Sequence, residues 1–237
     1  MKNLIFLTLV AGSLILGACN KGSMADYRVK TMTSGKGQTT EFIYSDDHKI
    51  ATIKLSDSTK VAFVYNGNTI TQTVSTPQNP MPRIETLHLS STGYVDSSSV
   101  SGPMGNMVTV NTHDADGYNT STKEYYAGTL KRVTESSFKD GNEVSRTIKN
   151  ETNVALGTVF FEYYTDKPNS IAPENQGMKF IGKDSKNLMK KVIQVLAKGD
   201  TLGSATFTYR FDDKGRVISK ATYDKGVQAD SSNISYY

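Results

Sequence analysis

Residues 41–74 read EFIYSDDHKIATIKLSDSTKVAFVYNGNTITQTV, in which short runs of β-branched and aromatic residues alternate with polar ones. Residues 45–48, 57–60 and 66–68 separate these runs and are rich in Asp, Asn, Ser and Gly. Alternation with a period of two is typical of strands with one buried face, and Asn, Asp and Gly favour the backbone of tight turns. The stretch therefore predicts consecutive antiparallel β-hairpins.

Similar runs continue almost to the C-terminus, and no long stretch has helical periodicity. Further strands are expected at residues 84–89, 94–95, 107–111, 123–126, 130–135, 144–148, 205–211, 216–223 and 232–237. A meander of about ten or more strands tends to curl or close, because closure removes exposed edges. The predicted fold class is all-β: an antiparallel β-meander of many short hairpins, curled into a partial or closed barrel.

Residues 168–204 interrupt this rhythm. Residues 168–177 read PNSIAPENQG, which is the composition of a loop. Residues 186–195 fit either a short helix or a strand, and the preferred interpretation is a loop followed by a strand over residues 191–196.

The N-terminus carries a targeting signal. Residues 1–19 read MKNLIFLTLVAGSLILGAC, a short basic start, a largely apolar stretch of 15 residues and small residues before a cysteine. The apolar stretch is too short to span a bilayer comfortably and fits a signal peptide. Leu16, Gly17, Ala18 and Cys19 resemble the bacterial lipobox, in which the cysteine thiol joins diacylglycerol and the chain is cut before it. Cys19 is the only cysteine in the chain; the alternative is an ordinary secretory signal with an incidental cysteine.

The expected division is a lipoprotein signal peptide over residues 1–18, a lipidated tether over residues 19–38 and a β-meander domain over residues 39–237. Several acyl chains anchor a protein far more firmly than one, so attachment to the membrane through Cys19 is expected to be stable. Asn20 stands where lipoproteins of the inner membrane carry aspartate, and Lys21 replaces the acidic cluster needed for surface export. We therefore expect an outer-membrane lipoprotein that faces the periplasm.

Charge and composition exclude several classes of partner. The chain has 27 Lys and Arg against 23 Asp and Glu, with no clustered basic arm, so there is no electrostatic case for nucleic acid. Removal of residues 1–18 leaves 219 residues with a net charge of +3, because Lys2 is the only charge removed. One cysteine is far short of a zinc-ligand set, and no phosphate-binding glycine loop occurs. We expect no cofactor.

Residues 209–223 read YRFDDKGRVISKATY and resemble the tyrosine–aspartate, or Rhs-type, hairpin repeat, whose core is an aromatic residue, Asp, Gly-Arg and an aliphatic residue. Together with the lipobox, residues 163–169 (YYTDKPN) and residues 180–188 (FIGKDSKNL), this hairpin resembles the Bacteroidota lipoproteins of unknown function with a porin-like fold. The resemblance covers most of residues 40–237. It implies a single β-meander curled into a partial barrel and implies no reaction. The turns at residues 90–93 and 127–128 lack the Asp-x-x-Gly-Arg core.

A porin-like curl does not predict a pore. A membrane barrel needs strands of about 9 to 11 residues with one continuous apolar side toward the lipid. The predicted strands are shorter, and their second faces carry Lys, Thr, Ser, Glu and Asp. The lipid on Cys19 is therefore the expected membrane attachment.

Candidate catalytic and metal-binding groups are few. His48, His88 and His113 lie on different predicted hairpins, and no serine-centred nucleophile motif occurs. Residues 114–117 (DADG) resemble the start of a calcium loop, but Tyr125 stands at the position where that loop needs a bidentate Glu. A plain hairpin turn is the preferred interpretation, and neither a catalytic nor a metal site is assigned.

The 13 tyrosines and nine phenylalanines fit either cross-strand packing, which is preferred, or a stacking surface for sugars or peptides. Residues 57–59 (DST) and 200–202 (DTL) resemble the Bacteroidota O-glycosylation signal, which makes Ser58 and Thr201 candidate attachment sites. The leading hypothesis is a non-enzymatic, lipid-anchored envelope domain that binds a glycan, a small ligand or a protein partner. The alternatives are a structural or assembly component of the outer membrane, and a hydrolase with carboxylate or tyrosine chemistry, which would need two carboxylates within about 10 Å on a concave face.

Overall fold

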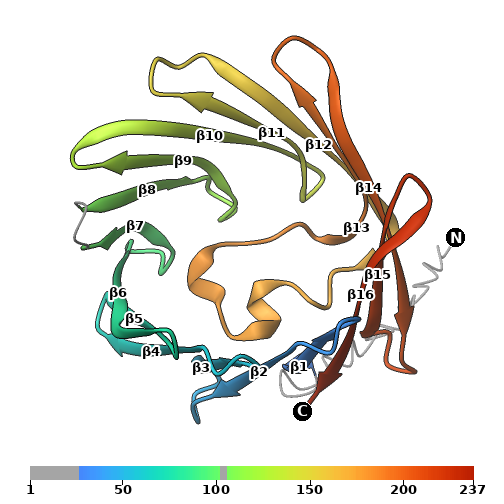
Figure 1. Ribbon diagram of the computed structural model, residues 1–237, viewed down its shortest axis with the longest axis horizontal. Helices are drawn as coiled ribbons and strands as arrows, with labels where there is room; N and C mark the ends of the chain where they lie inside the picture. The colour runs from blue at the N-terminus through green and yellow to red at the C-terminus, as the bar shows by residue number, and fades with distance from the viewer. Residues whose placement is uncertain (1–26, 102–105) are drawn as a thin grey trace, which may run out of the picture.

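Sixteen antiparallel strands form one closed barrel in the computed structural model, which describes residues 27–101 and 106–237. Each strand pairs with its neighbours in the sequence, and β16 (Val227–Tyr236) pairs with β1 (Val29–Ser34) to close the ring (Figure 1). The barrel is therefore an up-and-down meander, which confirms the predicted fold class.

The other strands follow one another around the ring in chain order. They are β2 (Thr39–Tyr44), β3 (Ile50–Leu55), β4 (Lys60–Asn66), β5 (Thr69–Thr76), β6 (Asn79–Leu89), β7 (Val95–Val100), β8 (Met107–His113), β9 (Asn119–Tyr126), β10 (Thr129–Lys139), β11 (Asn142–Asn150), β12 (Ala155–Pro168), β13 (Asn187–Leu196), β14 (Thr201–Phe211) and β15 (Val217–Asp224). Two short 3-10 helices, η2 (Pro173–Gln176) and η3 (Lys179–Ile181), lie in the connection from β12 to β13.

One form of hairpin turn explains the placement of the turn-forming residues. Between β14 and β15, Asp212 Oδ1 accepts the backbone N–H groups of Lys214 at 3.0 Å and Arg216 at 2.8 Å. Gly215 takes a φ of 75°, a conformation that side chains disfavour. Arg216 Nε donates to Asp212 Oδ2 at 2.7 Å. Asp114 caps the turn between β8 and β9 through the same pair of amide contacts. The Asp-x-x-Gly pattern is thus a side-chain cap on a tight turn.

Tyrosine hydroxyls tie strands together inside the barrel. Tyr44 donates to the carbonyl of Val29 at 2.6 Å, and Tyr65 donates to the carbonyl of Ile50 at 2.9 Å. Each acceptor lies 15 residues before its tyrosine. Tyr44 and Tyr65, which are 21 residues apart, therefore make the same kind of contact. Hydroxyl-to-carbonyl contacts are also made by Tyr164, Tyr209, Tyr236 and Tyr237. Most of the lumenal tyrosines are therefore packing residues, as the sequence favoured.

The connection between β12 and β13 folds into the lumen of the barrel (Figure 1). We call residues 169–186 the insert. Its backbone is held at three places on the wall, where Lys183 donates to Gly117, Lys186 donates to Gly141 and Ile50 donates to Gly177. The loop composition of this segment was predicted, but its position inside the barrel was not.

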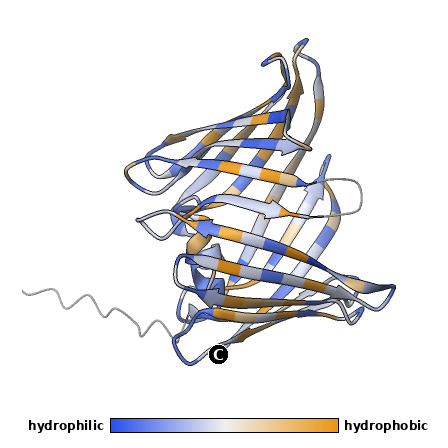
Figure 2. Cartoon of the chain, turned by 90° about the vertical axis from the view of Figure 1, so that its left-hand side faces the viewer, coloured by the Kyte–Doolittle hydropathy of each residue, from blue (hydrophilic) through white to orange (hydrophobic). Residues whose placement is uncertain are grey.

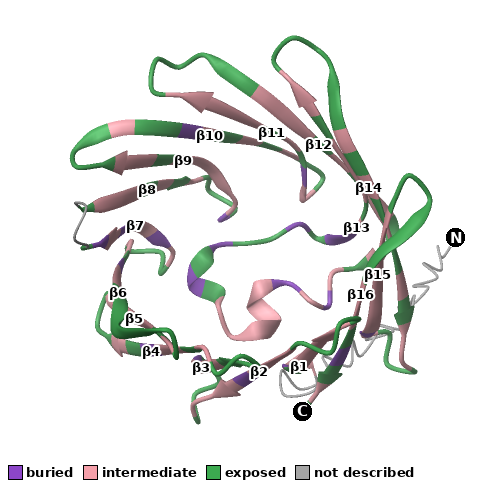
Figure 3. Cartoon of the chain, in the orientation of Figure 1, coloured by how far each residue is buried: buried purple, intermediate pink, exposed green. Residues whose placement is uncertain are grey.

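The hydrophobic core lies between the insert and the barrel wall. Phe180 of the insert packs against Phe63 and Tyr65, with ring centroids 6.1 and 6.3 Å apart. Ile50 and Ile70 on the wall are completely buried beside this cluster. Figure 3 shows buried segments on the insert and on the strands around it. The insert therefore supplies the inner half of the core.

Polar side chains interrupt the outer wall. The strand register pairs Thr71 with Thr86, and Thr86 with Ser99, in one outward row. Glu41 pairs with Lys54 in another, with Lys54 Nζ 3.6 Å from the Glu41 carboxylate. Hydrophilic and hydrophobic segments alternate along the strands in Figure 2. This pattern differs from the continuous apolar band of membrane barrels. In the described part of the chain, no helix is long and apolar enough to cross a membrane.

Three expectations need correction. β1 lies within residues 19–38, so the barrel begins at Val29 and not at residue 39; a bulge between Val29 and Thr31 disrupts the alternation that reveals a strand. β12 was missed, because its apolar and polar residues come in blocks and do not alternate. With 14 residues in β12 and 11 in each of β6, β10 and β14, several strands are also longer than expected. β13 confirms the preferred strand and begins earlier, at Asn187.

Candidate functional site

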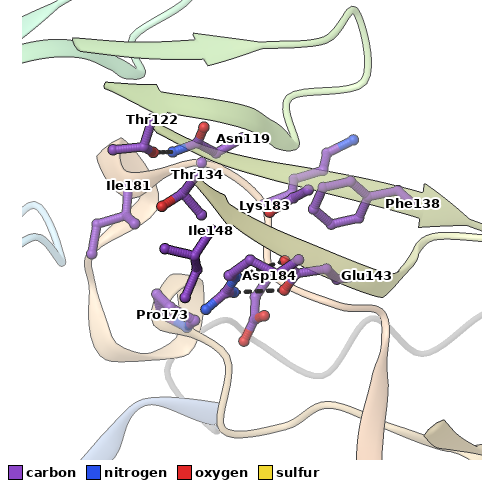
Figure 4. Close-up of a pocket in the computed structure, with 13 residues that line it drawn as sticks. Asn119, Thr122, Thr134, Phe138, Glu143, Ile148, Pro173, Ile181, Lys183 and Asp184 are labelled. Carbon is purple, nitrogen blue, oxygen red and sulfur yellow. Dashed lines mark hydrogen bonds and ion pairs between the residues drawn. The ribbon is translucent and has the colours of Figure 1, made fainter. Parts of the chain in front are cut away.

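A polar pocket lies in the lumen between the insert and strands β9 to β11 (Figure 4). Its volume is about 470 Å³. The wall contributes Asn119, Thr122, Thr134, Ser136, Phe138, Glu143, Arg146 and Ile148, and the insert contributes Pro173, Ile181, Gly182, Lys183 and Asp184. We call this space the lumenal pocket.

A fixed ion pair forms one side of the lumenal pocket. Arg146 donates from Nε to Glu143 Oε1 at 2.8 Å and from Nη2 to Glu143 Oε2 at 2.6 Å. Both residues lie on β11, where a bulge opposite Ser137 and Phe138 lets residues three apart reach the same side. The guanidinium carbon also lies 5.4 Å from the centre of the Phe161 ring. A two-pronged pair of this kind fixes the position of both groups.

Asp184 brings a second carboxylate to the lumenal pocket from the insert. Its Oδ1 accepts the backbone N–H of Ser185 at 2.7 Å, and its Oδ2 accepts Asn169 Nδ2 at 3.2 Å. Burial raises the pKa of Asp184 above its ordinary value, and the negative charge of Glu143 adds to this rise. The Glu143 carboxylate therefore lies close enough to affect the ionisation of Asp184, and Figure 4 shows the two residues in the same pocket.

Ser185 fixes this part of the insert to the wall. Its Oγ accepts the backbone N–H of Glu143 at 3.1 Å and donates to Tyr163 Oη at 2.9 Å. Burial raises the pKa of Tyr163 to about 12, so its phenol stays protonated at neutral pH. A protonated phenol cannot take the serine proton. Ser185 therefore positions its neighbours and is not activated as a nucleophile.

The opposite side of the lumenal pocket combines amide and hydroxyl groups with aromatic rings. Asn119 Nδ2 donates to Thr122 Oγ1 at 3.1 Å, while Asn119 Oδ1 is buried without a hydrogen-bond partner in the described chain. Phe138 stacks on Tyr118 with ring centroids 4.6 Å apart. Lys183 Nζ lies 5.6 Å from the centre of the Tyr118 ring. The pocket thus offers donors, acceptors, both signs of charge and an aromatic face.

The residues predicted from sequence lie elsewhere. Leu16, Gly17, Ala18 and Cys19 fall outside the described residues. Ser58 lies in the turn between β3 and β4 with a φ of 68°, and Thr201 is the first residue of β14. Both are exposed, and both lie at hairpins far from the lumenal pocket in the strand order. Their O-glycosylation stays a prediction.

The structure does not bring the remaining candidates together. His113 stacks on Tyr94 with ring centroids 5.2 Å apart, and His48 and His88 belong to other hairpins. Asp114 caps its own turn through backbone amides, so residues 114–117 form the hairpin that was preferred over a calcium loop. Within residues 27–101 and 106–237, no group of three or more His, Cys, Asp or Glu side chains could hold a metal ion.

Sequence reasoning did not single out Glu143, Arg146 or Asp184. Asp184 does fall within residues 180–188, a segment that was noted for its resemblance. Glu143 and Arg146 gave no signal, because an alternating strand would place residues three apart on opposite faces. Their pairing depends on the bulge in β11, which could not be recognised in the sequence.

Comparison with known proteins finds solved structures with a similar fold. No protein-family model and no curated protein matches the sequence. The chain is similar to two porin-like proteins. One, from Bacteroides uniformis, is 13% identical with a TM-score of 0.65, and the match covers 88% of this chain and 96% of that one. The other, from Bacteroides vulgatus, is 15% identical with a TM-score of 0.60, and the match covers 89% of this chain and 99% of that one.

Identities of 13% and 15% show a shared fold and nothing more specific. The porin-like architecture implied by the resemblance is confirmed. Membership of a Bacteroidota lipoprotein family and the tyrosine–aspartate repeat stay predictions.

Proposed function

We propose that this barrel binds a hydroxyl-rich ligand, such as a short glycan, in the lumenal pocket. The observation that carries the proposal is the set of polar side chains that the insert and the wall direct into one space (Figure 4). Its volume of about 470 Å³ is in the range of small-molecule sites, roughly 300 to 1,000 Å³.

The chemistry of the pocket suits the alternating hydroxyl and C–H groups of a sugar. Carboxylate oxygens of Asp184 and Glu143 accept hydroxyl hydrogens, and Arg146 and Lys183 donate to hydroxyl oxygens. Phe138 offers a ring face for the C–H surface. The buried, unpartnered Oδ1 of Asn119 marks a further acceptor at the same wall.

Calorimetric titration with a panel of oligosaccharides tests this function. We expect binding by the native protein and a loss of about tenfold or more in affinity for Asp184→Asn and Arg146→Gln, because each removes a charged hydrogen-bonding group. Lys54→Gln changes a charge on the outer wall and is the matched control, with affinity unchanged. The absence of binding to every oligosaccharide, or equal affinity in all variants, would contradict the proposal.

The proposed location is the periplasmic face of the outer membrane, with attachment through a lipid on Cys19. The lipobox supports it, as does the origin of the two similar porin-like proteins in Bacteroides. Radioactive palmitate should label the native protein in cells and should not label Cys19→Ala. Sensitivity of processing to globomycin provides an independent readout. Equal labelling of the two proteins would show that the anchor lies elsewhere.

A second candidate function is hydrolysis of a glycosidic bond, favoured by one observation. Asp184, with its raised pKa, lines the same pocket as Glu143, and two carboxyl groups in unlike environments divide the acid and base roles. Against it, Glu143 is held by Arg146. Incubation with oligosaccharides and chromatography of the products decides between the two. Products that appear with the native protein and not with Asp184→Asn would establish a hydrolase.

A further inference from the structure

A second cavity lies on the other side of the insert from the lumenal pocket. Its volume is about 610 Å³, and it is bounded by the insert and by the hairpins that join β2 to β3, β4 to β5 and β6 to β7. We call it the rim cavity. It shares no lining residue with the lumenal pocket.

One part of the rim cavity is apolar. Ile70, Leu89, Tyr65 and Phe180 contribute to its lining. Ile70 is fully buried in the core, and Phe180 is held against Tyr65 and Phe63. This surface is therefore rigid and preformed, and it suits an apolar ligand group.

Arg28 places a partly buried positive charge at the same cavity. Its Nε is buried without a hydrogen-bond partner, and no carboxylate of the described residues forms an ion pair with it. Its guanidinium carbon lies 5.5 Å from the centre of the Tyr44 ring and 5.6 Å from that of Tyr237. Arginine stays charged at any physiological pH. The aromatic faces compensate the charge of Arg28 only in part, so an anionic ligand group in the cavity would stabilise its guanidinium.

The other charged groups of the rim cavity do not supply that anion. Asp47 is bound to Lys49 at 2.6 Å, and hydrogen bonds from Lys49 and Ser45 lower the pKa of Asp47 to about 2. Glu174 Oε1 accepts the backbone N–H of Asp184 at 3.4 Å, while its Oε2 is buried without a partner. Neither acid therefore forms an ion pair with Arg28 among the described residues, and Glu174 Oε2 is an acceptor for a ligand donor.

We infer that the rim cavity binds an amphipathic monoanion, with its acidic head group at Arg28 and its apolar body against Ile70, Leu89 and Phe180. The inference is independent of the proposed function, because the two sites share no residues. Fatty acids and short apolar peptides with a free carboxylate both have this chemistry. A peptide would in addition offer its amine to Glu174.

Fluorescence titration with two related dyes tests the inference. Anilinonaphthalene sulfonate is an apolar anion, and phenylnaphthylamine has a similar ring system without charge. We expect Arg28→Gln to weaken binding of the anionic dye about tenfold or more, and to leave binding of the neutral dye unchanged. Arg28→Lys keeps the charge without the planar fork and should give an intermediate loss. Arg132→Gln removes a half-exposed guanidinium on β10 that lines neither cavity, and it is the matched control with binding of both dyes unchanged.

Competition then identifies the source of the anion. Displacement of the anionic dye by laurate indicates a fatty acid, and displacement by trileucine indicates a peptide. If neither displaces the dye, or if Arg28→Gln binds it as tightly as Arg132→Gln does, the inference is wrong. Should Arg28→Gln fail to fold, the comparison of Arg28→Lys with the native protein still decides, because a cavity that does not use the guanidinium would bind the dye equally in both.

Discussion

The two ends of the barrel differ in what they do with apolar side chains. The hairpins that join even to odd strands, the insert, the start of β1 and the end of β16 lie at one end, which we call the insert end. The hairpins that join odd to even strands lie at the other, the open end. All of the buried core cluster belongs to the insert end, including Val29, Ile50, Ile70, Leu188 and Val217.

At the open end, large apolar residues at the hairpins are left exposed. They are Leu55, Met81, Tyr126, Val154, Leu156, Leu202 and Val227, with exposed fractions from 37% to 72%. The contrast has a geometric cause. A ring of this many strands is too wide for its own side chains to fill, so a core forms only where the insert supplies the missing half. Both cavities follow from this, since each lies where the insert meets the wall imperfectly.

The largest predicted effect comes from removing the inner half of the core. Phe180→Ala should lower the free energy of unfolding by about 3–5 kcal/mol, because a buried aromatic ring leaves a cavity that the wall cannot refill. Urea denaturation followed by circular dichroism measures it. Val64→Ala, on the outer wall at 62% exposure, is the control with little change. A small loss for Phe180→Ala would mean that the insert contributes little to the core.

A smaller effect is expected where the insert meets β15. Ser170 Oγ accepts the backbone N–H of Val217 at 2.9 Å, and both residues are buried. Ser170→Ala leaves this amide unpaired and should cost about 1–3 kcal/mol. Ser204→Ala makes the same change at an exposed position near the open end and should cost almost nothing. Equal unfolding midpoints for the two variants would show that the contact is dispensable.

Acidic residues at the two ends should respond to pH with opposite signs. The raised pKa of Asp184 means that its ionised form destabilises the folded state. The contribution of Asp184 to the free energy of unfolding therefore falls as pH rises through the ordinary carboxyl range. The backbone N–H of Thr59 holds the pKa of Asp57, near the open end, below its ordinary value. Its contribution is present at neutral pH and is lost as pH falls.

Thermal unfolding of the two Asn variants measures this difference. The melting temperature of Asp184→Asn minus that of the native protein should be more positive at pH 7 than at pH 3. For Asp57→Asn, the same difference should be more negative at pH 7 than at pH 3. A pH-dependent change of the same sign in both variants would contradict the predicted difference between the two ends.

The sequence revealed local structure better than it revealed contacts between distant segments. Strand alternation and turn residues predicted most hairpins because both depend on neighbours in the chain. The number of strands indicated a curled sheet and left a partial and a closed barrel both open. β1 and β12 were missed because a bulge in one and blocks of apolar and polar residues in the other obscure the period of two.

The lumen could not be predicted, because its contacts join residues far apart in the sequence. Asn142 and Asn187, which exchange two hydrogen bonds beside the lumenal pocket, lie 45 residues apart. Loop composition placed residues 168–177 outside regular structure, yet composition is the same for a loop on the surface and one inside a wide barrel. Glu143, Arg146 and Asp184 become neighbours only through that placement.

The smallest effect belongs to the open end, where one residue type allows a matched test. Val217 is completely buried at the insert end, and Val227 is 72% exposed at the open end. Val217→Ala removes buried methyl groups and should cost about 2 kcal/mol. Val227→Ala should change the free energy of unfolding by less than about 0.5 kcal/mol, because this side chain is exposed to water in the folded and unfolded states alike. A large loss for Val227→Ala would mean that the open end is covered in solution, since only burial against another surface would make those methyl groups contribute to stability.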